Sequence, residues 1–344
     1  MTSTHYDAIV IGGGAAGLSA AQALGRSLRR TLVIDAGAPR NRFAARMHNV
    51  LGHDGIPPLE LLERGRAEAR GYGVEFASGT VVAVRELADE SGLCVDFRGS
   101  TLSESERAGS AESATVAAET AGTAGTAGTA TVTAGILIVA TGVSDTLPDV
   151  PGLAEYWGSS VLHCPYCHGW EVRGSRLAVL ATSPMSLHQA TLIRQWSEQF
   201  TVFSAEIGEL DPAVAEALRT RGTAIVPDPV IEVLGDGERV TGVRTADGVE
   251  HPIDAIFTMG TLTAHDGFLS ELQLDRTDMP FGSFLAVDAA GRTSHPRIWA
   301  IGNIANPMAT VPIAMGAGAM AGGAANFVLV EDDVAAALGA VRAA

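Results

Sequence analysis

The nine residues from His163 to Glu171, HCPYCHGWE, combine two cysteines, two histidines and an acid. A C-x-x-C pair followed directly by histidine fits a redox dithiol, half of a metal site or a haem attachment point. The chain has only one other cysteine, Cys94, which is too few for a disulfide framework of the secreted kind. The elements around the pair are needed to decide among these alternatives.

The bulk composition indicates a soluble globular protein. The chain has 344 residues, enough for two domains, and 47% of them are hydrophobic. Its 23 basic and 39 acidic residues give a formal charge of −16, which disfavours nucleic acids and anionic membranes as partners. The start, MTSTHYDAIVIGGG, lacks a basic segment ahead of its apolar stretch, and no run of about 18 uninterrupted apolar residues follows. We therefore expect a cytoplasmic protein with no nucleic-acid or membrane partner.

The first 40 residues have the pattern of a nucleotide-binding βαβ unit. Residues 6–11 and 31–37 predict buried strands, and residues 18–30 between them predict a helix. Gly12, Gly14 and Gly17 supply the G-x-G-x-x-G spacing, and Asp35 ends the second strand. The first glycine permits a tight turn, the second lets the backbone approach a pyrophosphate, and the third lets the helix lie close to the sheet. The helix N-terminus attracts phosphate, and the Asp35 carboxylate can accept hydrogen bonds from a ribose.

A second strand, helix and strand pattern recurs in residues 176–206. We predict an α/β protein with two Rossmann-like domains, the second inserted in the first. The predicted ranges are 1–152 and 283–344 for the first domain and 153–282 for the inserted one. Between about residues 100 and 133 the composition changes to Ser, Thr, Ala, Gly and Glu, which predicts a flexible surface insertion.

Four motifs together resemble the two-domain thioredoxin-reductase-like flavoproteins across almost the full length. They are the glycine motif, the ATG of Ala140–Gly142 before a proline-rich crossover, the C-x-x-C, and the late IWAIGN of residues 298–303. The resemblance implies the thioredoxin reductase-like architecture, FAD as cofactor and, by analogy, a homodimer. The FAD contacts that it implies are Gly12, Gly14, Ala15, Ala16, Gly17, Asp35, Ala36, Arg40, Arg42, Asn49, Val81, Thr141, Gly142, Gly302, Asn303, Val311, Pro312 and Ile313.

Two of these contacts have an alternative interpretation, and a third departs from the family pattern. Arg40 and Arg42 are well placed for the cofactor, with solvated surface arginines as the competing interpretation. The family usually has Gly-Asp where this chain has Gly302-Asn303. Asparagine can still hydrogen-bond a hydroxyl but carries no charge, and we expect FAD binding to survive.

The resemblance also places the CPYC segment beside the flavin, with Cys167 facing the flavin and Cys164 meeting the substrate. His168 stands where thioredoxin reductases commonly have aspartate, and imidazole is suited to moving the protons of two thiols. CPYCHGWE resembles the flavoprotein dithiol oxidases of the same fold, such as those that close the disulfides of gliotoxin and holomycin. His163 and Glu171 are weaker candidates, with solvated or hydrogen-bonded loop residues as the alternative.

The rival interpretations of the pair are each disfavoured. Haem attachment requires export to an oxidising site, and zinc requires about four ligands, for which no second cysteine pair exists. A purely structural disulfide across so short a loop adds little stability. We therefore expect no metal and assign the catalytic roles to Cys164, Cys167 and His168.

A thioredoxin reductase binds NADPH through a second glycine motif in the inserted domain, and this chain lacks it. Ala181, Ser183 and Ser186 stand where the three glycines are expected, and Pro184 removes an N–H donor from the turn. The next strand, within residues 200–210, is followed by acidic residues and lacks a basic cluster that would hold the 2′-phosphate of NADPH. Because electrons then have no entry from NADPH, we predict an FAD-dependent oxidase of a small-molecule dithiol, with O2 as acceptor and H2O2 as product. The alternatives are a thioredoxin or disulfide reductase fed by NADPH or another donor, and a non-catalytic flavin-bound redox sensor.

Overall fold

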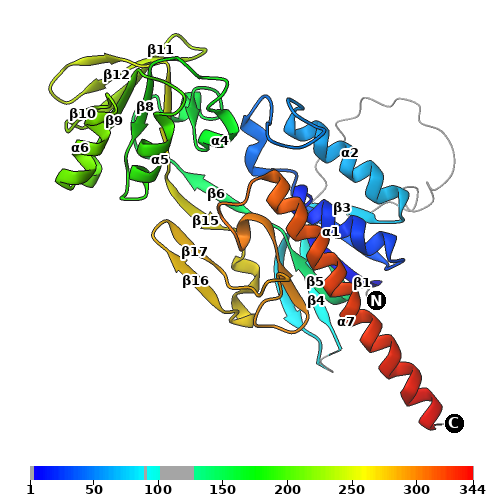
Figure 1. Cartoon of the computed structure of the whole chain (residues 1–344). Helices are drawn as coiled ribbons and strands as arrows, with labels where there is room; N and C mark the ends of the chain where they lie inside the picture. Colours follow the sequence, from blue (N-terminus) through cyan, green and yellow to red (C-terminus); the bar gives the residue numbers. More distant parts are fainter. Residues whose placement is uncertain (1–3, 89–90, 101–127, 344) are drawn as a thin grey trace, which may run out of the picture. The chain divides into compact units, whose positions relative to one another are not determined.

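The computed structural model describes residues 4–88, 91–100 and 128–343 (Figure 1). The chain divides into two compact units. Unit 1 comprises Met1–Arg40, Leu59–Ser144 and Thr263–Ala344, and unit 2 comprises Asn41–Pro58 and Asp145–Leu262. The chain crosses between them in β6 (Val143–Thr146) and β15 (Thr261–Ala264), which pair as a two-stranded sheet. The predicted α/β fold, with one Rossmann-like domain inserted in the other, is confirmed.

Unit 1 is built on one six-stranded sheet. Its strands are β1 (Thr4–Ile11), β2 (Thr31–Asp35), β3 (Glu75–Glu86), β4 (Leu93–Ser100), β5 (Thr129–Val139) and β18 (Ile298–Ala300). Parallel pairing gives the order β18-β5-β1-β2-β3, and β4 pairs antiparallel with both β3 and β5. The register sets Ile11 opposite both Ile34 and Val139. The carboxyl ends of β1, β2 and β5 therefore lie at one edge, where nucleotide sites of this kind of sheet are found.

Part of the predicted insertion at residues 100–133 is strand instead. Residues 101–127 lie outside the described residues. Thr129–Thr133, however, begin β5, and Arg98 to Cys94 of β4 pair antiparallel with Thr129 to Thr133. The segment TATVT has only one bulky apolar residue, Val132, so its composition resembles the low-complexity stretch before it. Threonine nevertheless favours strands, and the ladder to β4 satisfies the backbone groups of the segment.

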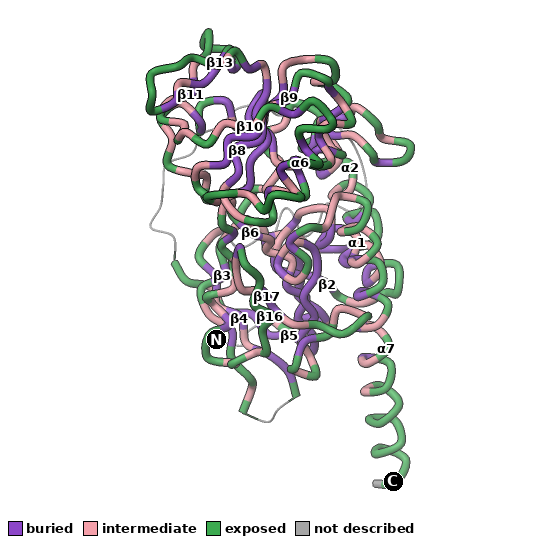
Figure 2. Tube along the Cα trace, turned by 60° about the vertical axis from the view of Figure 1, so that its left-hand side comes forward, coloured by how far each residue is buried: buried purple, intermediate pink, exposed green. Residues whose placement is uncertain are grey.

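Two helices cover one face of the unit 1 sheet. Ala20 and Leu24 of α1 (Ala15–Arg26) and Ala321 and Ala325 of α7 (Val311–Ala343) are buried in one apolar cluster with β1, β2, β5 and β18. The two helices lie very close together, because a side chain at Gly318 of α7 would overlap the carbonyl oxygen of Ala16. Small residues on both helices permit this approach. Figure 2 shows the buried interior of the sheet beside the exposed outer part of α7.

The opposite face of the unit 1 sheet is covered by shorter elements. Leu269 of the 3₁₀ segment Gly267–Leu272 is buried in the cluster formed by β3, β4 and β5. The remaining elements of unit 1 are α2 (Pro58–Gly71), β16 (Arg276–Met279), β17 (Gly282–Leu285) and the 3₁₀ segment Gly302–Ile304. A further 3₁₀ segment, Arg40–Phe43, stands where the chain leaves unit 1.

Unit 2 repeats the α/β plan on a smaller scale. Its parallel sheet has the order β10-β9-β8-β14-β7, and β11, β12 and β13 form an antiparallel sheet. The strands are β7 (Val161–Leu162), β8 (Leu177–Leu180), β9 (Phe200–Phe203), β10 (Ala224–Val226), β11 (Val230–Gly235), β12 (Val240–Thr245), β13 (Glu250–Pro252) and β14 (Ala255–Thr258). Its helices are α4 (Pro165–His168), α5 (Ser186–Ile193) and α6 (Pro212–Thr220), with 3₁₀ segments at Ala154–Tyr156 and Ala205–Ile207. Residues of α5 and α6 pack on one face of the parallel sheet, and residues of β11 and β12 pack on the other.

The unit boundaries differ from the predicted domain ranges in two places. Residues 263–282, predicted in the inserted domain, belong to unit 1 because Leu269 is buried in its core. Asn41–Pro58, predicted in the first domain, belong to unit 2. There, Phe43 packs so closely on Gly158 that any side chain at Gly158 would overlap it. Both differences arise from tertiary packing of loop segments that carry no periodic pattern.

Candidate functional site

The glycine motif forms a tight turn at the end of β1. Gly12 has a φ of 104°, a left-handed conformation that favours glycine, and a side chain there would overlap the carbonyl oxygen of Ala140. A side chain at Gly17 would overlap the carbonyl oxygen of Gly12. These two glycines are therefore required by the packing of the protein itself, whether or not a ligand is bound.

Gly14 is different, because a side chain there would meet no atom within 4 Å. It is the N-cap of α1, and no side chain caps this helix end. The first backbone N–H groups of a helix have no partner within the helix and carry a positive partial charge. An open space at such an end fits a phosphate group.

The Asp35 carboxylate is held at the end of β2 by two donors. The backbone N–H of Gly13 donates to one oxygen at 3.0 Å, and the guanidinium of Arg66 pairs with the other. The carboxylate thereby lies beside the glycine turn, where a ribose would be expected. Each oxygen still has a lone pair to offer, because a carboxylate accepts about four hydrogen bonds.

Thr141, two residues after the end of β5, has a buried hydroxyl oxygen with no hydrogen-bond partner within the part of the chain that the structure describes. Buried polar atoms are rarely left without a partner. The uncapped helix end, the open space at Gly14, the fixed Asp35 and this hydroxyl share one sheet edge. They fit the diphosphate and ribose of FAD.

Asn303 organises the loop that leads into α7. Its side-chain nitrogen donates to the carbonyl oxygens of Asn306, Pro307 and Ala309 at 3.1 to 3.2 Å. Arg40 donates to the carbonyl of Pro307 as well, at 3.1 Å. An aspartate at position 303 has no proton to donate at neutral pH and would face these carbonyls with negative charge. The departure from Gly-Asp thus has a structural reason within this chain.

Cys164 and Cys167 form a disulfide at the start of α4, with a Cα–Cα distance of 5.2 Å. Cys164 is the N-cap, and its sulfur accepts a hydrogen bond from the backbone N–H of Cys167 at 3.2 Å. The preceding segment is anchored by Gln189 of α5, whose amide donates to the carbonyl of His163 at 2.8 Å. Gly169 ends the turn, and a side chain there would overlap Trp196. The dithiol is therefore held in a fixed geometry by its neighbours in unit 2.

His168 lies beside the pair in a partly buried environment. Burial lowers the pKa of His168 below its ordinary value, the negative charge of Glu171 opposes that shift, and His48 adds to it. A lowered pKa keeps this imidazole neutral, and so able to accept a proton, at neutral pH.

His48 connects two carboxylates in the same unit. Its Nε2 lies 3.4 Å from a carboxylate oxygen of Glu171, and its Nδ1 lies 3.3 Å from one of Asp54. The hydrogen bond from His48 and one from the backbone of Asn49 lower the pKa of Asp54. Asp54, His48 and Glu171 thus form a chain of polar groups that ends next to His168.

The position of the missing second glycine motif is filled by side chains. Ala181 is fully buried after β8, and the Ser186 hydroxyl accepts a hydrogen bond from the backbone N–H of Thr182 at 3.1 Å. The Thr182 hydroxyl in turn donates to the carbonyl of Met259. In a dinucleotide site the backbone N–H groups of such a turn face a pyrophosphate. Here the N–H of Thr182 is instead bonded to a side chain of the same segment.

Residues 6–318 match the sequence pattern of the pyridine nucleotide-disulphide oxidoreductase family. This chain belongs to that family. The oxidoreductase is 30% identical to thioredoxin reductase sirT of Leptosphaeria maculans over 348 residues, covering 96% of both chains. The crystal structure of HlmI superposes with a TM-score of 0.84 at 36% identity, covering 98% of this chain and 96% of that one. An oxidoreductase from Agrobacterium tumefaciens superposes with a TM-score of 0.81 at 33% identity, covering 95% of this chain and 99% of its own.

The predicted site residues of the oxidoreductase are divided between its two units. Most of the predicted FAD contacts lie in unit 1. Several of them lie at the sheet edge formed by the ends of β1, β2 and β5, and Val311, Pro312 and Ile313 form the first turn of α7. Val81 also lies there, but its side chain is buried in the core and leaves only its main chain for a ligand. Unit 2 holds Arg42, Asn49, Cys164, Cys167 and His168. Arg42 lies over the ring of Phe43, with its guanidinium carbon 4.2 Å from the ring centre.

Sequence reasoning missed two residues of the oxidoreductase that contact the predicted site. Arg66 reaches Asp35 from α2, and His48 reaches Glu171 from the segment between the glycine motif and α2. Neither residue lies in a motif. The only sequence signal is the amphipathic pattern of residues 57–70, which indicates a helix but does not specify which basic side chain turns toward β2.

Proposed function

We propose that this protein is an FAD-dependent dithiol oxidase that closes a disulfide in a small molecule, with O2 as the final electron acceptor. The observation that carries the proposal is the Cys164–Cys167 disulfide beside a partly buried His168. In the same unit, the turn that would bind the pyrophosphate of NADPH is filled by side chains. The family is flavin-dependent, and the edge of unit 1 fits FAD. A cytoplasmic location and the absence of a bound metal are parts of the same proposal.

The cysteine pair of this chain accounts for oxidation of the substrate dithiol. A substrate thiolate attacks the sulfur of Cys164, the bond between the two cysteines breaks, and Cys167 leaves as a thiolate. The second substrate thiolate then attacks the mixed disulfide and releases Cys164. The substrate leaves as a disulfide, having given two electrons to the cysteine pair and two protons to the site.

His168 is assigned the protons of this exchange. Thiolate, not thiol, is the attacking species, and a neutral imidazole can accept the substrate's proton. Because its pKa is lowered, His168 is in this neutral form throughout the neutral range.

FAD would be held by Gly12, Gly14, Asp35 and Thr141. When bound, it accepts two electrons from a dithiol and passes them to O2, which becomes H2O2. The net reaction is one dithiol plus one O2 to one disulfide plus one H2O2. The substrate class is inferred from CPYCHGWE, which resembles oxidases of small natural-product dithiols.

A reductase is the second candidate, because the relative from Leptosphaeria maculans carries the name thioredoxin reductase. A reductase would need electrons from NADPH or another donor. The internally bonded turn at Thr182 and Ser186 argues against a pyrophosphate in that place. The proposal therefore ranks the oxidase first.

Oxygen consumption with a panel of small dithiols tests the oxidase, and anaerobic mixing with NADPH tests the reductase. We expect oxygen uptake with stoichiometric H2O2 on dithiols, and no bleaching of the flavin by NADPH within a turnover time. Rapid bleaching by NADPH together with reduction of a disulfide substrate would instead establish the reductase. If dithiols reduce the flavin but neither reaction turns over, the protein is a redox sensor.

Glu171→Gln is expected to move the acid side of the pH–rate profile to lower pH. Glu171 raises the pKa of His168, so removing its charge lowers that pKa further, and the imidazole stays neutral in more acidic solution. The rate of flavin reduction by a dithiol, followed against pH by stopped flow, checks this. Glu216→Gln on α6 is the matched control. A shift toward higher pH, or an equal shift in the control, would contradict the assignment of His168.

A further inference from the structure

Two large aromatic rings beside the dithiol are exposed to solvent. Tyr166 stands between Cys164 and Cys167 in the sequence. Trp170 follows His168 by two residues. Each of the two aromatic side chains is 66% exposed. The other three tryptophans of the chain all lie in described residues and are partly or fully buried. Exposed tyrosine and tryptophan rings next to a reactive group are typical of a binding surface, because covering them with a ligand is favourable.

The helical turn at the dithiol brings the two rings to one side. α4 spans Pro165–His168, and Gly169 after it keeps helical dihedral angles, with a φ of −62° and a ψ of −31°. Tyr166 and Trp170 are four residues apart, and positions with this spacing lie on the same face of a helix, about 6 Å apart along its axis. Cys164 caps the same turn, so a molecule that attacks its sulfur starts at the turn that carries both rings.

Trp196 holds the Tyr166 ring in place. The two rings meet edge to face, with centroids 5.9 Å apart and an interplanar angle of 86°. Trp196 is itself fixed, because it packs against the core of unit 2 and lies so close to Gly169 that a side chain there would overlap it. Its backbone carbonyl also accepts a hydrogen bond from the N–H of Gly174 at 2.8 Å. The exposed ring of Tyr166 therefore stands on a rigid support.

Arg173 holds the Trp170 ring. Its guanidinium carbon lies 4.0 Å from a ring centre of the indole, and the same guanidinium donates a hydrogen bond to the carbonyl oxygen of Trp170 at 2.5 Å. This cation–π contact covers one face of the indole. Because two thirds of the side chain is nevertheless exposed, the opposite face is open. The indole is thus held in one orientation with a free face.

We propose that Tyr166 and Trp170 bind the ring of the substrate, and that the substrate is a dithiol carried on a flat, unsaturated ring system instead of a flexible chain. This inference rests on the proposed oxidase function and adds the substrate class. Rings that are already held in place lose little freedom on binding, so stacking of a flat ligand on them is favoured. A flexible aliphatic dithiol has no face to stack and gains less from the same surface.

The area of the two rings fits a small molecule better than a protein. Tyrosine and tryptophan side chains bury about 150 to 250 Å² each, so two that are 66% exposed offer about 200 to 330 Å². A specific protein interface takes about 800 Å² from each partner. A small ring dithiol can be covered by this surface, whereas a protein dithiol would need further contacts.

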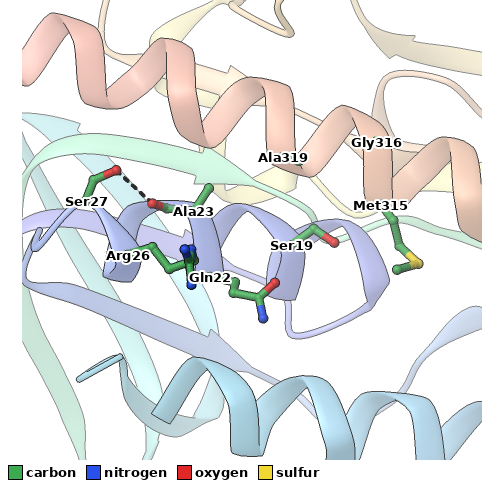
Figure 3. A pocket seen from close by; sticks show the side chains of 8 residues that line it. All are labelled: Ser19, Gln22, Ala23, Arg26, Ser27, Met315, Gly316 and Ala319. Carbon is green, nitrogen blue, oxygen red and sulfur yellow. Dashed lines mark hydrogen bonds between the residues drawn. The ribbon is translucent and has the colours of Figure 1, made fainter. Parts of the chain in front are cut away.

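The groove between α1 and α7 in unit 1 offers no comparable surface (Figure 3). Its lining, which lies wholly in described residues, contains neither an aromatic residue nor a cysteine. Its two longest polar side chains, Gln22 and Arg26, are bonded to Glu68 and Tyr72. A ring dithiol in this groove would find neither a stacking face nor a partner for its thiols. Tyr72 is nevertheless an exposed ring with an arginine over it, because the guanidinium carbon of Arg26 lies 4.9 Å from its centre.

Trp170→Ala tests the proposal with two dithiols that close disulfide rings of the same size. The ring dithiol is ortho-bis(mercaptomethyl)benzene, and the chain dithiol is dithiothreitol. In the wild type, kcat/KM is expected to be at least about 10-fold higher for the ring dithiol. Trp170→Ala should lose about 10-fold in kcat/KM for the ring dithiol, mainly through KM, and change that for dithiothreitol by less than about two-fold. Trp170→Phe should keep most of the preference, because phenylalanine still offers a ring face.

Tyr72→Ala is the matched control, because it removes an exposed ring beside an arginine in unit 1. It should keep the wild-type ratio of the two kcat/KM values. Equal use of the two dithiols by the wild type, an equal loss for both in Trp170→Ala, or the same change of ratio in Tyr72→Ala would each overturn the proposal. So would a loss of turnover on reduced thioredoxin in Trp170→Ala with the ring dithiol unaffected, since the surface would then serve a protein.

Binding of the closed cyclic disulfide of the ring dithiol separates this inference from the proposed oxidase function. Isothermal titration calorimetry measures its dissociation constant without turnover, and Trp170→Ala should raise that constant about 10-fold. If the product binds in this way but no dithiol is oxidised, the oxidase function fails and the ring site stands. If both dithiols are oxidised but the wild type and Trp170→Ala bind the product equally, the ring site fails and the oxidase stands.

Discussion

Cys164→Ser is expected to lower the rate of dithiol oxidation by about 10³-fold or more, because the attacked sulfur is removed. A serine oxygen cannot form the mixed disulfide or close a disulfide with Cys167. The protein should still bind FAD, since the glycine turn lies in unit 1 and is built from other residues. Oxygen uptake and H2O2 formation with a saturating dithiol measure the loss, and the visible flavin spectrum measures the retained cofactor.

Cys94→Ser is the matched control for this variant. Cys94 is the remaining cysteine, lies in β4 of unit 1, and is the free thiol beside Arg85. It should leave the turnover unchanged. Full activity of Cys164→Ser would show that the dithiol is not the entry for electrons, and an equal loss in Cys94→Ser would point to a general effect on folding.

Gly14→Val is expected to weaken FAD binding while leaving the apoprotein folded. Gly14 has a φ of −76° and a ψ of −177°, an extended conformation that valine adopts readily, and a side chain there meets no protein atom within 4 Å. In the apoprotein this space is open to the valine side chain, whereas in the FAD-bound protein a phosphate would occupy it. Forcing a side chain into filled space costs about 1 to 3 kcal/mol, or about 5- to 150-fold in the dissociation constant.

Fluorescence titration of the apoprotein with FAD measures this change, and thermal unfolding without FAD measures the fold. Gly17→Val is the contrasting variant. Its side chain would overlap the Gly12 carbonyl, so the apoprotein itself should lose at least about 1 to 3 kcal/mol of stability. Unchanged FAD affinity in Gly14→Val would place the cofactor elsewhere, and a destabilised apoprotein would show that Gly14 serves the fold.

The α/β fold and the location of the first nucleotide site follow from local sequence patterns. Buried strands, glycines at fixed spacing and an acid at the next strand end are each short-range signals, and the parallel register then brings strand ends to one edge. The cysteine pair also follows from local sequence, because Cys164 and Cys167 are three residues apart and one helical turn joins them. These features need no knowledge of distant contacts.

The partners of the side chains in the loops were decided only by the tertiary structure. At Asn303 the sequence showed only the loss of a charge relative to the family, whereas the structure shows its amide bound to three carbonyls of the next loop. His48 and Arg66 meet their carboxylates through contacts between segments that share no motif. Likewise, apolar residues occur on all sides of α7, and only the packing of Ala321, Ala325 and Leu329 shows which side of the helix faces the sheet. The physical reason is common to all three: a periodic pattern specifies an element, while the direction and partner of a side chain depend on which other elements pack against it.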